Sequence, residues 1–291
     1  MQFRENGRAI GAMMLAMAGF ILNDTMVKLA SDSLPLGQII LVRGLIGTVL
    51  MAFACQVTGV FKEISTLWRG AVAWRMVGEV AATVFYLTAL IRLPIANATA
   101  ILQALPLVVT AGAAVVFRDR VGWRRWTAIA VGFSGVLLIV RPGLEGFNVY
   151  ALFAVAGMLF MALRDLATRG LPKETPTLGV ALLTTMAVSV LGAVLTGVQG
   201  WQPMDLRAWV FLTLAAVFIM VGYIFIIAAL RSGDIAVVAP FRYSIVLWAL
   251  VLGYIVWGDV PDLLTVLGIL VIVGTGIYTF FREQRLARNG R

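Results

Sequence analysis

Acid–base pairs at helical spacing stand inside long apolar stretches of the sequence. The three pairs are Asp24 and Lys28, Arg75 and Glu79, and Asp165 and Arg169. A spacing of four residues places both members of a pair on one helix face. Because a charge at bilayer depth costs about 2.5–3.5 kcal/mol, we expect these charges, with the adjacent Arg164, to form ion pairs. The spacing leaves open whether such pairs only hold the fold or also gate a pathway.

Two further arginines have no acid at helical spacing in their own apolar stretches. They are Arg43 and Arg242, and each needs an acceptor on another helix or in a wet cavity. Arg242 follows Pro240, and Pro106 lies in an earlier apolar stretch. Proline removes a backbone donor and bends or breaks a helix, and interrupted membrane helices are typical of transport sites. We therefore interpret Pro106 and Pro240 as helix breaks beside a site, with a role in packing alone as the alternative.

Polar and aromatic side chains inside the apolar stretches are the candidates to bind a ligand. Small-molecule sites usually have apolar walls and a few placed polar groups, and a guanidinium binds a carboxylate strongly. The expected substrate-binding residues are Asn23, Tyr86, Thr99, Gln103, Tyr223, Phe241, Arg242, Tyr243 and Trp248. For any one aromatic residue, helix packing or lipid contact is the alternative.

The composition excludes several kinds of chemistry. The chain has no histidine and one cysteine, Cys55, so it lacks Ser–His or Cys–His nucleophiles, an internal disulfide and histidine-based or multi-cysteine metal sites. The ATP-binding sequence G-x-x-x-x-G-K-[ST] does not occur, and nothing resembles a repeated channel filter. We therefore expect no enzyme, metal or cofactor, favour a transporter over a channel, and interpret Cys55 as a packing residue.

The elements that must position these side chains are membrane helices. The chain has 291 residues, of which 61% are hydrophobic and 13% charged, and its mean hydropathy is +0.97. A membrane helix needs about 20 apolar residues, and ten such segments fill almost the whole chain. The sequence thus predicts an all-α polytopic membrane protein. The expected spans are Arg8–Ala30, Pro35–Thr58, Ala71–Ile91, Pro94–Phe117, Trp123–Val140, Phe147–Thr168, Thr177–Val198, Leu206–Leu230, Asp234–Trp257 and Pro261–Phe281.

The positive charge is distributed unevenly along these spans. Of the 23 Lys and Arg residues, about 16 lie in segments on the N-terminal side of the membrane and about 3 in those opposite. The positive-inside rule then predicts that both termini are cytoplasmic. The net charge of +9 is thereby explained as a topology signal and a contact with the anionic inner leaflet, and no nucleic-acid partner is expected.

The two halves of the sequence match at a shift of about 140 residues. The matching pairs are Phe85 and Phe225, Leu90 and Leu230, Ile95 and Ile235, Asp119 and Asp259, Asp24 and Asp165, and Lys28 and Arg169. Five spans per half is an odd number, so the second half enters the membrane from the opposite side. We expect two inverted five-helix repeats, residues 1–143 and 144–291, an architecture typical of secondary transporters.

Several motifs carry a resemblance to a known family. They are Y-L-T-A-L-I-R-L-P-I-A-N-A-T-A from Tyr86, F-R-D-R-V-G-W from Phe117, A-P-F-R-Y-S from Ala239 and W-G-D-V-P-D from Trp257. The sequence resembles the EamA-type family of the drug/metabolite transporter superfamily over its full length, and is most similar to bacterial exporters of amino acids, including aromatic ones. One departure is Asp119, where many members carry Glu.

The resemblance implies a secondary transporter of the bacterial inner membrane that works by alternating access. The expected cargo is a small metabolite, with aromatic and other large neutral amino acids first. The alternatives are a nucleotide-sugar, sugar-phosphate or drug carrier of the same superfamily. From other classes, a channel or an intramembrane enzyme are the least favoured. Gly7 and Gly11 form a G-x-x-x-G pair that suits helix contacts, so either a monomer or a homodimer is expected.

Overall fold

The described part of the chain is helical throughout its regular elements. A computed structural model describes residues 2–59, 70–118, 122–144, 147–172, 175–232 and 235–289, and no strand occurs within them. The helices are α1 Gln2–Ala30, α2 Leu36–Thr58, α3 Gly70–Leu90, α4 Ile95–Leu102, α5 Leu105–Val116, α6 Trp123–Val140, α7 Val149–Arg169, α8 Thr177–Gln199, α9 Leu206–Ser232, α10 Ile235–Val238, η2 Ala239–Tyr243, α11 Ser244–Trp257 and α12 Leu263–Asn289.

Nine helical segments of the described residues are long and apolar enough to cross a membrane. They correspond to nine of the ten expected spans. The tenth, α3, forms at the expected place, but Arg75 and Glu79 make it less apolar than the others. The chain is therefore an all-helical multi-pass membrane protein.

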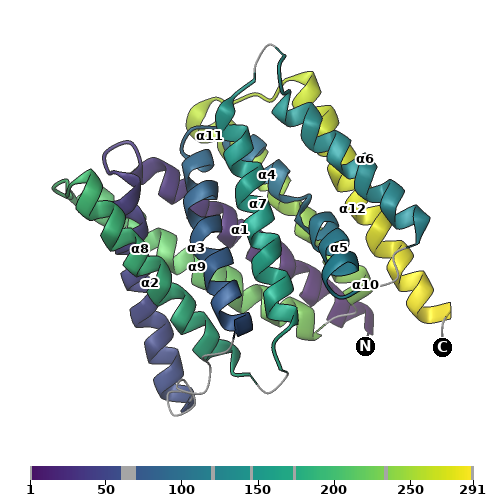
Figure 1. Cartoon of the computed structure of the whole chain (residues 1–291), viewed down its shortest axis with the longest axis horizontal. Helices are drawn as coiled ribbons and strands as arrows, with labels where there is room; N and C mark the ends of the chain where they lie inside the picture. The colour runs from purple at the N-terminus through teal and green to yellow at the C-terminus, as the bar shows by residue number, and fades with distance from the viewer. Residues whose placement is uncertain are drawn as a thin grey trace. The chain divides into compact units, whose positions relative to one another are not determined.

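Two of the expected spans are interrupted within the membrane-spanning length. The fourth consists of α4 and α5, and the ninth consists of α10, η2 and α11 (Figure 1). The other spans are single helices. Among the described spans, the helix is broken only in these two, and both breaks carry candidate site residues.

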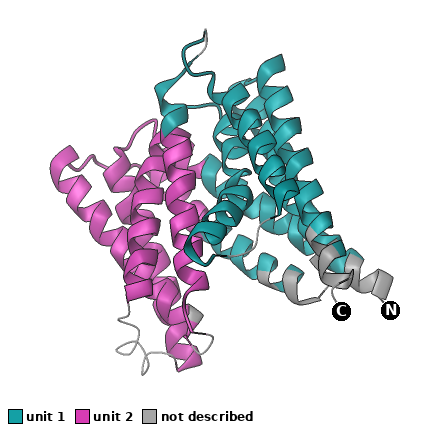
Figure 2. Ribbon diagram, turned by 45° about the vertical axis from the view of Figure 1, so that its right-hand side comes forward, with its two compact units in different colours: residues 1–25, 92–152, 217–291 teal, residues 26–91, 153–216 magenta. Residues whose placement is uncertain are grey.

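The helices group into two compact units, coloured separately in Figure 2. Unit 1 comprises residues 1–25, 92–152 and 217–291, and unit 2 comprises residues 26–91 and 153–216. Three of the four boundaries fall inside α1, α7 and α9, and the fourth lies between α3 and α4. Each unit takes helices from both halves of the sequence, so compactness does not follow the order of the chain.

Unit 2 is built on a very close contact between α2 and α8, which run side by side in Figure 1. Gly37 faces the backbone of Thr196, where an added Cβ would lie 2.6 Å from the amide nitrogen, and Gly192 faces the backbone of Leu41 in the same way. Small residues allow such approach and are the usual means of helix association in a bilayer. The two helices thus pack with no room for a side chain at these points.

Glutamine side chains close one end of this α2–α8 contact. The Gln38 amide is fully buried. Its Nε2 donates to the Gln202 carbonyl at 2.8 Å, and its Oε1 accepts from the Gln202 N–H at 2.9 Å. The N–H of Gly37 donates to Oε1 of Gln199 at 2.7 Å. The start of α2 is therefore fixed by one hydrogen bond to the last residue of α8 and by two to Gln202, which follows α8.

Unit 1 contains a second close pair, α6 and α12, which also lie side by side in Figure 1. Gly135 and Gly268 face each other's carbonyl oxygens, and an added Cβ would lie 2.9 Å and 2.7 Å from them. Gly132 lies beside Thr275 of α12. Helix α4 packs against α11, and α12 contacts both α4 and η2. Within unit 1, both interrupted spans thus rest on α12.

Candidate functional site

The helix breaks of unit 1 have a backbone cause. Gln103 and Ala104 end α4 through bonds from their N–H groups to residues three positions earlier, Ala100 and Ile101, at 3.1 Å. Pro106 is the second residue of α5, and Pro240 is the second residue of η2. Since proline has no N–H to continue a helix, each break coincides with one.

Buried polar atoms without a hydrogen-bond partner gather on the segments that carry these breaks. They are Oγ1 of Thr99 on α4, Oγ of Ser244 at the start of α11, and Nε1 of Trp248 one turn later. Thr99 is 2% exposed and Ser244 is 9% exposed. A buried polar group left without a partner costs about 1–3 kcal/mol. The two hydroxyls can donate to or accept from a ligand or water, and the indole N–H of Trp248 can donate.

Tyr243 and Arg242 stand at the end of η2, beside Ser244. The Tyr243 hydroxyl lies against the backbone of Gly276 in α12, where no side chain would fit. Arg242 is exposed and forms no ion pair with any described residue, and Phe241 is 36% exposed. Gln103 turns its Nε2 toward the Thr99 carbonyl at a long 3.4 Å. The second break therefore offers a guanidinium and a phenol from adjacent positions.

The remaining unit 1 candidates lie on α1, α9 and α11. Trp248 packs against the apolar cluster of α1 and α9. Tyr223 of α9 meets Phe20 edge-on, with ring centroids 5.4 Å apart. Asn23 is buried and donates from Nδ2 to Oδ1 of Asp24 at 2.9 Å. This contact places one acid of the predicted pairs next to a predicted ligand residue.

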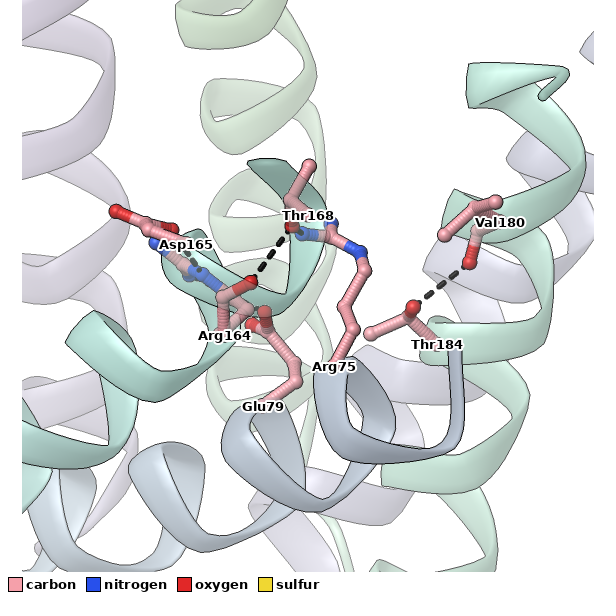
Figure 3. A network of polar contacts seen from close by, with 7 residues as sticks. All are labelled: Arg75, Glu79, Arg164, Asp165, Thr168, Val180 and Thr184. Carbon is pink, nitrogen blue, oxygen red and sulfur yellow. Dashed lines mark hydrogen bonds and ion pairs between the residues drawn. The ribbon is translucent and has the colours of Figure 1, made fainter. Parts of the chain in front are cut away.

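A charged network occupies unit 2, between α3 and α7 (Figure 3). The Nη1 of Arg164 donates to Glu79 at 3.1 Å, and its Nε donates to Asp165 at 2.8 Å. Gly78 allows this, because an added Cβ would lie 2.8 Å from the Arg164 amide nitrogen. One guanidinium thus serves two carboxylates, and the Glu79 contact joins helices far apart in sequence.

The other unit 2 candidates surround this network or lie apart from it. Arg75 donates from Nη1 to the Thr168 hydroxyl at 2.6 Å. Tyr86 is buried, with its backbone against Gly157 of α7, so within unit 2 it packs α3 against α7. Polar or ring contacts are also made by Lys28, Arg43 and Arg169.

Sequence reasoning missed three residues of these clusters. Ser244 gave a signal, since it directly follows the A-P-F-R-Y segment, but its hydroxyl was not distinguished from a helix-capping one. Thr168 gave none, because the spacing rule pairs charges only. Gly276 gave none either, because only the fold shows that it faces Tyr243. In the part of the chain that the structure describes, no group of three His, Cys, Asp or Glu residues could hold a metal ion.

Comparison with known proteins gives a consistent answer. The profile of the EamA-like transporter family matches twice, at residues 7–141 and 148–281. The chain is 26% identical over 269 residues to the pseudopaline exporter CntI of Pseudomonas aeruginosa strain UCBPP-PA14, covering 90% of this chain and 93% of that protein. It is 27% identical over 288 residues to the riboflavin transporter of Vibrio cholerae, covering 97% and 96%.

A further relative and a solved structure extend the comparison. The S-adenosylmethionine uptake transporter of Rickettsia prowazekii is 23% identical over 195 residues, 66% of this chain and 65% of that protein. A crystal structure with 19% identity superposes with a TM-score of 0.64, covering 95% of this chain and 98% of the other. The two family matches span most of the sequence, and the resemblance inferred from its motifs is confirmed: the chain belongs to the EamA-like transporter family.

Proposed function

We propose that this protein is a secondary transporter that exports amino acids, aromatic and other large neutral ones first, across the bacterial inner membrane. The observation that carries the proposal is the set of unpartnered polar atoms at the helix breaks of unit 1, on Thr99, Ser244 and Trp248. Buried polar atoms of this kind are retained when a ligand satisfies them. Membership in a transporter family supports transport over catalysis.

The chemistry of the second break favours a zwitterionic substrate. Arg242 has no carboxylate partner among the described residues, so its planar guanidinium can receive the substrate carboxylate in a bidentate contact. The oxygens of Gln103, Asn23 and Tyr243 can accept from an ammonium group without burying a second charge. Phe241 and Trp248 add aromatic surface for a large side chain.

Alternating access is the mechanism that we propose for movement. Two inverted five-helix repeats, residues 1–143 and 144–291, would exchange conformations around one site, and the two successive family matches support this division. Asp24 with Lys28 and Asp165 with Arg169 then act as gates on opposite faces. The distribution of Lys and Arg supports a cytoplasmic position for both termini.

A counterflow assay in liposomes tests the substrate. Labelled phenylalanine, methionine and threonine are offered to the wild type, to Arg242→Ala and to Arg207→Ala, an exposed arginine on the Phe211 ring that serves as the control. Riboflavin is included because one relative is named for it. We expect saturable flux of phenylalanine, at least tenfold lower in Arg242→Ala and unchanged in the control. Wild-type flux of riboflavin but of no amino acid rejects the proposed cargo.

The gates are tested by distance measurements between spin labels on the two faces. We expect Asp24→Asn and Asp165→Asn to shift the balance between inward-open and outward-open states in opposite directions. Shifts in the same direction count against gates related by an inverted repeat. Labelling of single cysteines at either terminus from outside the cell would contradict the proposed orientation.

A further inference from the structure

The antiparallel pair α6–α12 has two ends that are built differently. The register is set by Gly135 beside Gly268 and by Gly132 beside Thr275. The end of α6 therefore meets the start of α12, and the start of α6 meets the end of α12.

At the first end, one carboxylate satisfies two partners. Asp262 accepts from the Thr265 N–H at 3.0 Å, which caps α12, and it also accepts from the Arg141 guanidinium. Arg141 continues to the Thr265 hydroxyl at 3.2 Å. The Arg141 hydrogen bond and the Thr265 backbone bond hold the pKa of the Asp262 carboxyl well below its ordinary value. At this end, the charges of Asp262 and Arg141 therefore neutralise each other.

At the second end, the start of α6 and the arginine on α12 have no carboxylate partner among the described residues. Gly122 is the N-cap of α6, and no side chain caps that helix. Arg282, at the end of the apolar span of α12, has its Nη1 atom buried without a hydrogen-bond partner. A helix N-terminus and a buried guanidinium nitrogen both favour a negative oxygen ligand. A helix N-terminus and a guanidinium are the two kinds of group that Asp262 satisfies at the first end.

We propose that this second end of the α6–α12 pair binds a phosphate group, held by Arg282 and the uncapped start of α6. Phosphate oxygens accept from guanidinium and from helix N–H groups in the same way as the Asp262 carboxylate. The surroundings match a membrane surface: Trp123 is 71% exposed and Trp126 is 45% exposed, as is usual at an interface. Arg124 of α6 and Arg285 of α12 are also exposed.

The phosphate can come from an anionic lipid headgroup or from free phosphate, and thermal unfolding of the full chain in detergent distinguishes these sources. Wild type, Arg282→Gln and the control Arg285→Gln, one turn further along α12, are each mixed with phosphatidylglycerol, phosphatidylcholine or inorganic phosphate. We expect phosphatidylglycerol to raise the Tm of the wild type and of Arg285→Gln by several degrees, and of Arg282→Gln by less than half as much.

Each other outcome has a defined meaning. An equal rise with inorganic phosphate identifies a free phosphate site, whereas the same response of wild type and Arg282→Gln to every additive overturns the proposal. A gain-of-carboxylate variant provides a positive test. Gly122→Asp supplies the missing carboxylate from within, so we expect its Tm without lipid to match that of lipid-bound wild type and to respond little to phosphatidylglycerol.

Asp119 lies outside the described residues and is close in sequence to Gly122. The thermal unfolding experiment therefore includes an Asp119→Asn variant. If the site takes an external anion, Asp119→Asn responds to phosphatidylglycerol as the wild type does. If Asp119 itself fills the site, Asp119→Asn lowers the Tm without lipid and increases the response to phosphatidylglycerol, and the proposal is overturned. Transport activity is not required for any of these measurements, so they stand apart from the proposed cargo.

Discussion

Units 1 and 2 treat their polar groups in opposite ways. In unit 2, Arg164 serves both Glu79 and Asp165, and the Gln38 amide is matched on both of its atoms. In unit 1, two spans are interrupted, and the buried hydroxyls of Thr99 and Ser244 have no hydrogen-bond partner. Of the buried unpartnered atoms found in the described residues, only the Arg75 Nε lies in unit 2, on a guanidinium already bonded to Thr168.

The difference indicates a division of labour. Polar groups that hydrogen-bond to one another make a fold rigid and have little further binding free energy to offer a ligand. An unpartnered buried group destabilises the fold, and a ligand that hydrogen-bonds to it recovers that free energy. We therefore propose that unit 2 acts as a frame and unit 1 as the binding element. If the contrast is correct, substitutions of equal size should change stability in unit 2 and transport in unit 1.

The largest effect is expected from Arg164→Ala. The change leaves the Glu79 and Asp165 carboxylates partly buried without their shared cation. Removing one partner of a buried pair costs about 3–5 kcal/mol, and partial exposure reduces this to about 2 kcal/mol, or roughly 5 °C in Tm. Thermal unfolding in detergent measures it, with Arg207→Ala as the control. A Tm equal to that of the control would remove unit 2 from the role of frame.

Gly276→Ala should come next and should act on transport. The new methyl group would overlap the Tyr243 ring and displace it from the end of η2. We expect about a tenfold lower counterflow rate, equivalent to about 1.4 kcal/mol. Gly274→Ala is the matched control, because a Cβ there meets open space. Equal rates in the two variants would show that the position of Tyr243 does not matter.

Two threonines sharpen the contrast between the units. Thr99 in unit 1 has an unpartnered hydroxyl, whereas Thr184 in unit 2 donates to the Val180 carbonyl at 2.7 Å (Figure 3). We expect Thr99→Val to slow transport about fivefold, or about 1 kcal/mol, without lowering the Tm, since no internal bond is lost. Thr184→Val should leave the transport rate within about twofold. A lower Tm for Thr99→Val would reveal an internal partner.

The smallest effect is expected at the one closed charge cluster of unit 1 discussed above. Asp262→Asn keeps a capping oxygen but loses the ion pair with Arg141, and the exposed pair is worth about 0.5 kcal/mol, or roughly 1 °C in Tm. Because the folded pKa of Asp262 is lowered, its contribution is complete above about pH 4 and is lost on acidification. The Tm difference from wild type should therefore stay constant between pH 5 and 8 and decrease below pH 4. A difference that grows with acidification has the wrong sign for a depressed carboxyl pKa.

The sequence predicted the spans to within a few residues, because apolar length and flanking proline or glycine are local signals. Pro35 directly precedes α2, and Gly258 ends α11 in the left-handed conformation. The interrupted spans were also foreseeable, since Pro106 and Pro240 lack the N–H that a continuous helix requires. These features depend on residues close together in the chain.

Contacts between helices were not predictable in the same way. Spacing rules paired Arg75 with Glu79 and Asp165 with Arg169, but they give no information on which helices meet, so the bond between Arg164 and Glu79 was not predicted. The contact between Tyr243 and Gly276 likewise depends on how η2 lies on α12. A lack of partner, as for Ser244, becomes visible only when all neighbours are placed.

The buried Gln38 has a consequence for how the protein is made. Its partner Gln202 lies 164 residues later in the chain, and at about 5–20 residues per second the ribosome needs roughly 8–30 s to reach it. During that interval α2 is in the membrane with an amide that its final neighbour has not yet satisfied. The side chain of Gln38 in α2 therefore gains its hydrogen bonds only after the segment that follows α8 has been synthesised, and a chain truncated before Gln202 lacks them.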